Sequence, residues 1–423
     1  MLFRSTLNIG LTFLIGIILA RILSPREFGL VGMITIFIVI ATTFVNSGFN
    51  QALIRKQNCT QADFSTIFYF NIFTGFLFYL IIFASARGIS NFFGEPLLEP
   101  MIRVLGVGII INALTSVQTT ILTKQINFKL QAKISIISTT FSGTIGIVMA
   151  IYGYGIWSLI SKTIIGYAIT SILLWSWNKW RPSYIFDFSS LKELFSFGSK
   201  LLLSGLIGAL YSNIYYLIIG KYFTATELGY YTRADQFQAL PSSNLQGIIA
   251  RVSYPILSTI QNDIPRLREA YKVHIRSTMF ITFNLMLGLA AVGKPLILTL
   301  IGEKWVPSVI YLQMLCFVGM FYPLHALNLD MLQVQGRTDL YLRLEILKKI
   351  LAIPVIIMGI LYGIKIMIFG MIINTKIAYY LNSFWSGRFI GYSFSAQIKD
   401  VFPSFVFASL VNLIVFFEGL LLP

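Results

Sequence analysis

Long apolar runs separated by short polar connections form the dominant pattern of this chain. A helix that spans a bilayer needs about 20 apolar residues, and thirteen segments of suitable length and composition meet that need. They are 5–22, 28–48, 65–86, 100–122, 132–152, 155–177, 194–220, 237–260, 272–300, 305–333, 342–362, 366–386 and 398–420. The run at 272–300 is expected to end early, near Gly293-Lys294-Pro295, with a short interfacial piece after it. The pattern predicts an all-α protein, a polytopic transmembrane helical bundle.

One polar corner between two apolar helices occurs twice in the sequence. Ile18–Gly29 reads ILARILSPREFG, and Ile218–Gly229 reads IIGKYFTATELG. In each copy an apolar helix ends on a basic residue, which suits the negative end of the helix dipole. A Ser or Thr then caps the next helix, and a Glu three residues later completes a capping box. The shared corner favours an internal duplication, although capping boxes are common and apolar helices resemble one another.

The helix count is consistent with two related halves. Six predicted helices separate the two corners, an even number, so both corners should lie on the same side of the membrane. We therefore expect two parallel six-helix repeats related by an axis along the membrane normal. The expected parts are an N-terminal lobe at 1–177, a cytoplasmic linker at 178–193, a C-terminal lobe at 194–386 and an additional transmembrane helix at 387–423.

Composition and charge support a membrane protein and give its orientation. The chain is 56% hydrophobic and only 11% charged, whereas soluble domains carry about 25% charged residues. Most of the 32 Lys and Arg residues fall on one side if the N-terminus is cytoplasmic, as the positive-inside rule requires. In this orientation 178–192 faces the cytoplasm and 87–99 faces the outside. The net charge of +16 then reflects topology, and no nucleic acid is expected as a partner.

Four basic residues fall inside predicted spans, where charges are costly and usually face a cavity or a partner. Arg251 is the strongest candidate for substrate binding, and Asn244 shares its helix face. Lys200, Lys162 and Lys376 are the other three. The alternative for these long side chains is that they extend to the headgroups or form structural pairs.

Asp330 is the clearest acidic residue within a span, with His325 and Asn328 nearby in the sequence. It could couple transport to a cation or proton, or neutralise a buried base such as Arg251. Neither the two cysteines nor the two histidines have the spacing of a metal site, and no Walker loop is present. We therefore expect no metal, no cofactor and no catalytic residue.

The excess of cations over anions within the spans favours an anionic substrate. A phosphate or pyrophosphate group would form strong charge-assisted hydrogen bonds with Arg and Lys in a partly dry cleft. Hydroxyl and amide side chains such as those at 211–215 would suit sugars.

Five motifs resemble one known family across nearly the whole chain. They are LARILSPREFG, NSGFNQALIRK at Asn46–Lys56, FYFN at Phe68–Asn71, ARVSYPILSTIQND at Ala250–Asp263 and QGRTDLYLRLEILKK at Gln335–Lys349. Together they resemble the polysaccharide-transporter branch of the multidrug/oligosaccharidyl-lipid/polysaccharide flippase superfamily, in particular Wzx-type flippases that include colanic-acid exporters.

The resemblance implies a function and a location. Such proteins move undecaprenyl-pyrophosphate-linked oligosaccharides across the bacterial inner membrane, with two six-helix lobes around a cationic cavity. Arg251 matches an R-V-x-x-P position of the family. The implied partners are the lipid bilayer, the lipid-linked oligosaccharide, and the polymerase and glycosyltransferases of the same pathway. Members of this branch often have fourteen helices, which implies a missing or truncated helix after the thirteenth here.

Two other functions compete with a flippase. A drug or cation exporter of the same fold would need acidic residues in its cavity, and the predicted spans contain few. A membrane glycosyltransferase or O-antigen polymerase would need catalytic groups on an outer loop. The longest obvious outer connection, Arg87–Glu99, has only Glu95 and Glu99 as acids. The sequence therefore favours a non-enzymatic flippase that works by alternating access.

Overall fold

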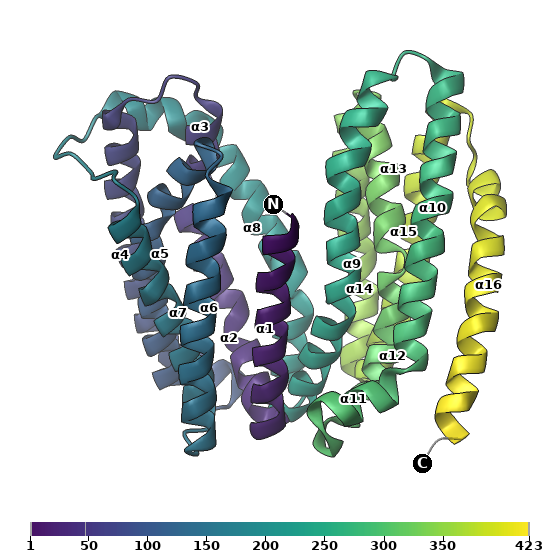
Figure 1. Cartoon of the computed structure of the whole chain (residues 1–423), viewed down its shortest axis with the longest axis horizontal. Coiled ribbons are helices and arrows are strands. Elements are labelled where there is room, and N and C mark those ends of the chain that lie inside the picture. Colours follow the sequence, from purple (N-terminus) through teal and green to yellow (C-terminus); the bar gives the residue numbers. More distant parts are fainter. Residues whose placement is uncertain (1, 47, 422–423) are drawn as a thin grey trace. The chain divides into compact units, whose positions relative to one another are not determined.

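The computed structural model describes residues 2–46 and 48–421, and these residues are almost entirely helical (Figure 1). Side chains are described in these ranges except at 2–6, 243–252, 254–255, 338 and 419–421. Each of the thirteen predicted segments is helical where it is described, and the described residues include no strand. The all-α class is confirmed.

The chain divides into two compact units, of which the first is Met1–Gly229. Its helices are α1 (Leu2–Ile22), α2 (Pro25–Asn46), α3 (Phe49–Arg55), α4 (Gln61–Phe93), α5 (Leu98–Lys124), α6 (Phe128–Ile151), α7 (Ile156–Trp177) and α8 (Phe188–Tyr222). Helices α4 and α5 run side by side (Figure 1), and α6 packs between α1 and α7. Helix α8 packs along α2, α3 and α4. A buried core that includes Phe49, Leu53, Phe68, Ile121 and Leu194 joins α3, α4, α5 and α8.

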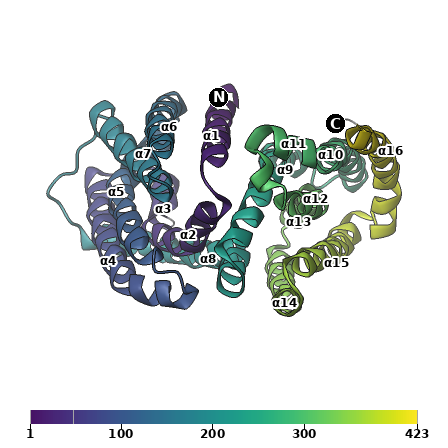
Figure 2. The same ribbon diagram turned by 90° about the horizontal axis from the view of Figure 1, so that it is seen from below.

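The second unit is Tyr230–Pro423. Its elements are α9 (Ala225–Thr259, which begins in unit 1), α10 (Ile264–Ala291), α11 (Gly293–Ile301), η1 (Glu303–Trp305), α12 (Ser308–Gly319), α13 (Tyr322–Val334), α14 (Thr338–Tyr362), α15 (Ile364–Ile390) and α16 (Phe394–Leu421). Helix α15 packs against α12, α13 and α14, and Figure 2 shows α14 and α15 side by side. Helix α16 lies along α10.

Three predicted helices are interrupted. The predicted run at 28–48 continues as α2 and, after a break, the short α3. The expected early end of the run at 272–300 is confirmed, because α10 stops at Ala291 and α11 follows. The span predicted at 305–333 is confirmed as the candidate membrane span Ser308–Val334, but it consists of two helices, since α12 ends at Gly319 and α13 begins at Tyr322. Pro323 near the start of α13 lacks an N–H donor, and its ring would clash with the preceding turn of a continuous helix.

Ten helical segments of the described chain are long and apolar enough to cross a membrane. The predicted spans at 5–22, 237–260 and 342–362 are helical, and parts of the first two lie among the residues whose side chains are not described. In α14 the charged residues within Arg343–Lys349 shorten the apolar part. The chain is a multi-pass membrane helical bundle.

Both predicted corners form, and they contact each other within unit 1. The Glu27 carboxylate accepts a hydrogen bond from the Ser24 backbone N–H at 2.6 Å and another from the Ser24 hydroxyl at 2.9 Å. Thr224 and Glu227 make the reciprocal bonds of a complete capping box at 3.2 Å each. The predicted capping box is confirmed in full at the second corner, and at the first corner the bonds from Ser24 to the Glu27 carboxylate are confirmed.

Two glycines allow the corners to touch. A Cβ atom on Gly29 would lie 1.6 Å from the Ala225 carbonyl oxygen, and one on Gly229 would lie 1.9 Å from the Pro25 carbonyl oxygen. Positions 25 and 225 are equivalent in the repeat, as are 29 and 229. The contact is therefore reciprocal, as at a two-fold interface.

The boundary between the compact units lies at Gly229–Tyr230, whereas the predicted linker lies at 178–193. The difference arises because α8, assigned by sequence to the second lobe, packs on α2, α3 and α4. The division into two six-helix repeats stays a prediction.

Candidate functional site

The short helix α3 packs against α8. At the start of α3, a Cβ atom on Gly48 would lie 2.1 Å from the Gly198 carbonyl oxygen. The two backbones therefore touch at a pair of glycines, and any side chain at position 48 would separate them. This contact places the C-terminal turn of α3, which ends on Arg55, beside the first turns of α8.

A pocket of about 450 Å³ lies between α3 and α8. We call it the cationic pocket, and it is lined by Ala52, Arg55, Lys56, Glu193, Leu194, Ser196, Phe197 and Lys200. Three of these residues are basic and one is acidic. Its volume falls in the range of about 300–1,000 Å³ that is typical of small-molecule sites.

Lys56 has its charge compensated by two carboxylates. Its ammonium lies 2.9 Å from a carboxylate oxygen of Glu193 and 3.1 Å from one of Asp63. The hydrogen bond to Glu193, with a contribution from Asp63, raises the pKa of Lys56. Asp63 is fully buried and also completes a capping box with Thr60 at the start of α4. Lys56 therefore ties α3 to α4 and α8 rather than offering a free charge.

Arg55 and Lys200 have no such compensation. The Arg55 guanidinium lies over the Phe197 ring, 4.4 Å from its centroid, in a cation–π contact that orients the group without neutralising it. Neither Arg55 nor Lys200 forms an ion pair with a described residue. Both side chains are exposed. The pocket therefore offers two available positive charges, one of them a planar fork that matches phosphate geometry.

A buried polar cluster lies in unit 2. Asn328 of α13 accepts hydrogen bonds from Ser386 of α15 at 2.5 Å and from Gln397 of α16 at 3.3 Å. Tyr379 donates to Gln397 at 3.4 Å, and His325 contacts Asn382 at 3.3 Å. We call these six residues the polar seam: His325, Asn328, Tyr379, Asn382, Ser386 and Gln397. In an apolar interior such hydrogen bonds hold helices in register.

Asp330 lies on α13 next to the polar seam. One of its carboxylate oxygens is buried and has no hydrogen-bond partner among the described residues. A buried carboxylate with a free oxygen can accept a proton or a cation.

Comparison with known proteins decides the family. Residues 18–310 match the family model described as polysaccharide biosynthesis protein. The chain belongs to this family. It is 30% identical over 313 residues to the teichuronic acid biosynthesis protein TuaB of Bacillus subtilis, which covers 71% of this chain and 63% of that protein. It is 26% identical over 357 residues to the lipopolysaccharide biosynthesis protein WzxC of Escherichia coli, which covers 83% of this chain and 72% of that protein. The chain thus spans less than two thirds of the Bacillus relative.

Solved structures show the fold of this polysaccharide biosynthesis family member. The lipid II flippase MurJ in an inward closed conformation superposes with a TM-score of 0.74 at 16% identity, covering 99% of this chain and 97% of that chain. An inward-facing multidrug resistance MATE family transporter superposes with a TM-score of 0.71, covering 92% and 95%. The predicted resemblance to the flippase superfamily is confirmed at the level of family and fold.

The structure brings one predicted site residue into the cationic pocket and leaves others apart. Lys200 lines the pocket. Lys162 of α7 is partly buried, and its stem packs where Gly146 of α6 leaves room. Lys376 is exposed on α15, on the same face as Ile373 and Ile377. The roles of these lysines stay predictions.

Arg251 and Asn244 fall in α9, but their side chains lie outside the described residues. Sequence reasoning assigned Arg55 to topology and missed it as a site residue. The sequence did contain a signal for Arg55. In NSGFNQALIRK a glycine is followed by a short apolar stretch that ends on two basic residues, which is typical of a short helix with a cation at its C-terminus.

Proposed function

We propose that this family member carries a lipid-linked oligosaccharide, on an undecaprenyl-pyrophosphate carrier, across the bacterial inner membrane by alternating access. The product would serve surface polysaccharide or lipopolysaccharide biosynthesis. The observation that carries the proposal is the pair of uncompensated cations, Arg55 and Lys200, in one pocket of a chain that belongs to a polysaccharide biosynthesis family.

The pyrophosphate is the part of such a substrate that most resists crossing the membrane. Moving an ionised phosphate from water into an apolar medium costs many kcal/mol unless the charge is paired. Arg55 offers a bidentate fork and Lys200 a point charge, and these replace part of the lost hydration. Phe197 holds the guanidinium in place before the substrate arrives, so less side-chain entropy is lost on binding.

The orientation belongs to the proposal. With the N-terminus in the cytoplasm, the connections after α3 and α7 are cytoplasmic, and the cationic pocket meets the side on which activated sugars are available. The glycan polymerase and glycosyltransferases of the same pathway are the proposed partners. Arg251 and Asn244 remain proposed substrate contacts on α9, together with Lys162 and Lys376.

Asp330 is proposed to couple transport to an ion. Its free buried oxygen and the neighbouring polar seam support this role, because a cation or proton there would remove an unfavourable buried charge. Asp330→Asn should then reduce export and its dependence on the ion gradient together. A purely structural role would reduce only the amount of protein in the membrane.

Complementation of a flippase-null strain tests the proposed function. Losing one charge-assisted contact costs about 1.5–3 kcal/mol, so Arg55→Ala and Lys200→Ala should each lower substrate affinity about 10- to 150-fold. Surface glycan should fall sharply while membrane levels of the protein stay normal. Arg55→Lys should retain partial export, because it keeps the charge without the fork.

Lys192→Ala is the matched control. Lys192 is exposed on the first turn of α8 and does not line the cationic pocket. The Lys192→Ala variant should therefore export surface glycan at the wild-type level. Full glycan display by Arg55→Ala/Lys200→Ala at normal abundance would refute the anion-binding role.

A further inference from the structure

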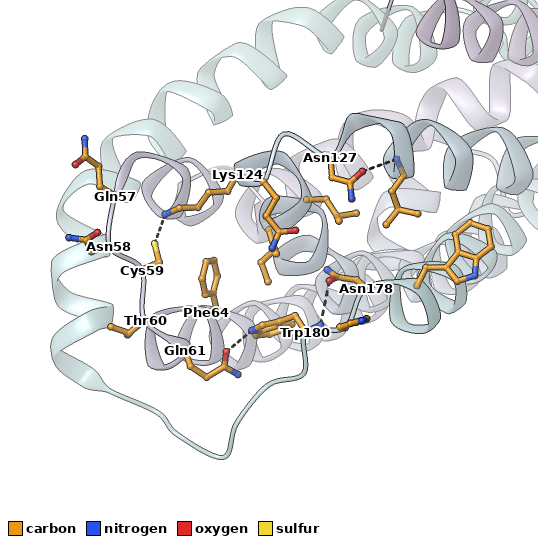
Figure 3. A pocket seen from close by; sticks show the side chains of 16 residues that line it. Gln57, Asn58, Cys59, Thr60, Gln61, Phe64, Lys124, Asn127, Asn178 and Trp180 are labelled. Carbon is orange, nitrogen blue, oxygen red and sulfur yellow. Dashed lines mark hydrogen bonds between the residues drawn. The ribbon is translucent and has the colours of Figure 1, made fainter.

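A second, larger pocket lies in unit 1 (Figure 3). Its volume is about 890 Å³, and it opens between the α3–α4 connection, the α5–α6 connection and the end of α7. We call it the amide pocket. It is lined by Gln57, Asn58, Cys59, Thr60, Gln61, Phe64, Ile121, Leu122, Lys124, Gln125, Asn127, Leu130, Trp177, Asn178, Lys179 and Trp180. Lys56 of the cationic pocket and Gln57 of the amide pocket are adjacent in the chain.

Hydrogen bonds fix the walls of the amide pocket. Lys124 donates to the Leu53 carbonyl at 2.9 Å and to the Lys56 carbonyl, and its ammonium lies 2.8 Å from the Cys59 sulfur (Figure 3). The Trp180 indole N–H donates to the Gln61 side-chain carbonyl at 2.8 Å. Because these bonds already hold the connections together, a ligand would lose little affinity to ordering them.

The walls combine amides with aromatic and aliphatic surface. Six of the lining residues are Asn or Gln, and an amide both donates and accepts hydrogen bonds, as a sugar hydroxyl does. The side chains of Gln57, Asn58 and Gln125 are exposed and make no hydrogen bond with the described residues. Trp177, Trp180 and Phe64 supply flat apolar surface for the carbon face of a sugar ring.

The electrostatic balance of the amide pocket is positive. Lys124 and Lys179 are present, and none of the sixteen described residues lining it is Asp or Glu. Lys179 is exposed at the end of α7 and has no ion pair with a described residue. A ligand carrying a carboxylate would therefore bind better than its neutral counterpart.

We propose that the amide pocket binds sugar residues of the transported glycan and prefers a sugar that carries a carboxylate. The proposal rests on the proposed function. The site lies outside the cationic pocket, so the pyrophosphate and the sugars of one substrate would occupy neighbouring pockets on either side of the segment 56–57. Glycan selectivity would then reside in the amide pocket and carrier recognition in the cationic pocket.

Two soluble oligosaccharides serve as probes with the full chain in lipid nanodiscs. Hyaluronan tetrasaccharide alternates glucuronate with N-acetylglucosamine, and chitotetraose contains N-acetylglucosamine only. Binding is followed by tryptophan fluorescence, because two of the six Trp residues line the amide pocket. We expect saturable binding of both probes, with the acidic probe bound more tightly.

Variants separate the amides from the charge. Asn58→Ala/Gln125→Ala removes two exposed amides and should lower the binding affinity of both probes about 10-fold. Lys179→Gln should weaken the acidic probe about 2- to 5-fold and leave the neutral probe unchanged. Asn91→Ala, an exposed amide on α4 that does not line the pocket, should bind both probes like the wild type.

Three outcomes would overturn the glycan site. They are no saturable binding of either probe to the wild type, wild-type affinity in Asn58→Ala/Gln125→Ala, and displacement of chitotetraose by sodium pyrophosphate. Arg55→Ala should bind chitotetraose normally. If Arg55→Ala/Lys200→Ala exports glycan normally while the amide variants lose probe binding, the carrier anchor is wrong and the glycan site stands. Loss of export in Arg55→Ala/Lys200→Ala, together with normal probe binding in the amide variants, would refute the glycan site alone.

Discussion

At the scale of single residues, two neighbouring cations have opposite roles. Lys56 is held by Asp63 and Glu193, whereas Arg55 lies over an aromatic ring with no carboxylate beside it. Sequence alone treats them as one basic pair at a helix end. The difference arises because Arg55 is the last residue of α3, whereas Lys56 follows the helix with an extended backbone and reaches Asp63 and Glu193.

Lys56→Met should therefore reduce stability rather than substrate affinity. It leaves the fully buried Asp63 without its cation, so we expect a loss of about 1–3 kcal/mol. Adding Asp63→Asn should recover part of that loss, since the uncompensated charge is gone. Thermal unfolding of the wild type, Lys56→Met and Lys56→Met/Asp63→Asn measures this loss and its recovery. Equal midpoints for the wild type and Lys56→Met would show that the pair contributes nothing.

At the scale of elements, the start of α8 depends on one carboxylate. Asp187 accepts hydrogen bonds from the backbone N–H groups of Ser189 and Ser190 at 3.0 and 3.1 Å, and from the Ser190 hydroxyl at 2.6 Å. The Ser190 hydroxyl bond, followed by the two backbone bonds, lowers the pKa of Asp187. The second turn of α8 carries Glu193 and Leu194 into the cationic pocket, so this cap also positions the site.

The cap makes the start of α8 sensitive to acid. Because the folded pKa is lowered, the stabilisation is complete above the ordinary carboxyl pKa of about 4. It is lost as the pH falls through the lowered value. Hydrogen exchange at 188–191 should lose protection below about pH 4 in the wild type. Asp187→Asn keeps a capping oxygen that does not titrate, so its protection should not change with pH in this window. The same acid response in both proteins would assign the effect to another group.

Sequence predicted the helices better than their breaks. Apolar runs of about 20 residues allow little except a spanning helix, so the predicted segments lie in helical parts of the described chain and ten helical segments there can span. The break before α3 was missed because Gly48 matters only through its contact with Gly198, far away in the chain. Of the two available cations in the cationic pocket, only Lys200 was predicted, for the same reason. Lys200 stood out as a charge within a span, but only the packing of α3 on α8 places Arg55 beside it.

At the scale of the whole molecule, the orientation is open to direct labelling. In a background with Cys59→Ser and Cys316→Ala, single cysteines at Ser189 and Asn91 report on opposite ends of unit 1, and both positions are exposed. With the N-terminus cytoplasmic, an impermeant thiol reagent should label Asn91→Cys in intact spheroplasts and Ser189→Cys only after lysis. The reverse pattern would invert the topology and place both pockets on the outer side.

The contact between Gly29 and Gly229 limits the substitutions that both positions can accept. Each glycine makes room for the carbonyl of the other copy, so a side chain gained at either position would push on the same shared backbone. The effects of the two substitutions should therefore not add, since the second would disturb a contact already lost. The two corners should therefore both keep glycine at this contact, whatever substitutions accumulate in the helices on either side of it.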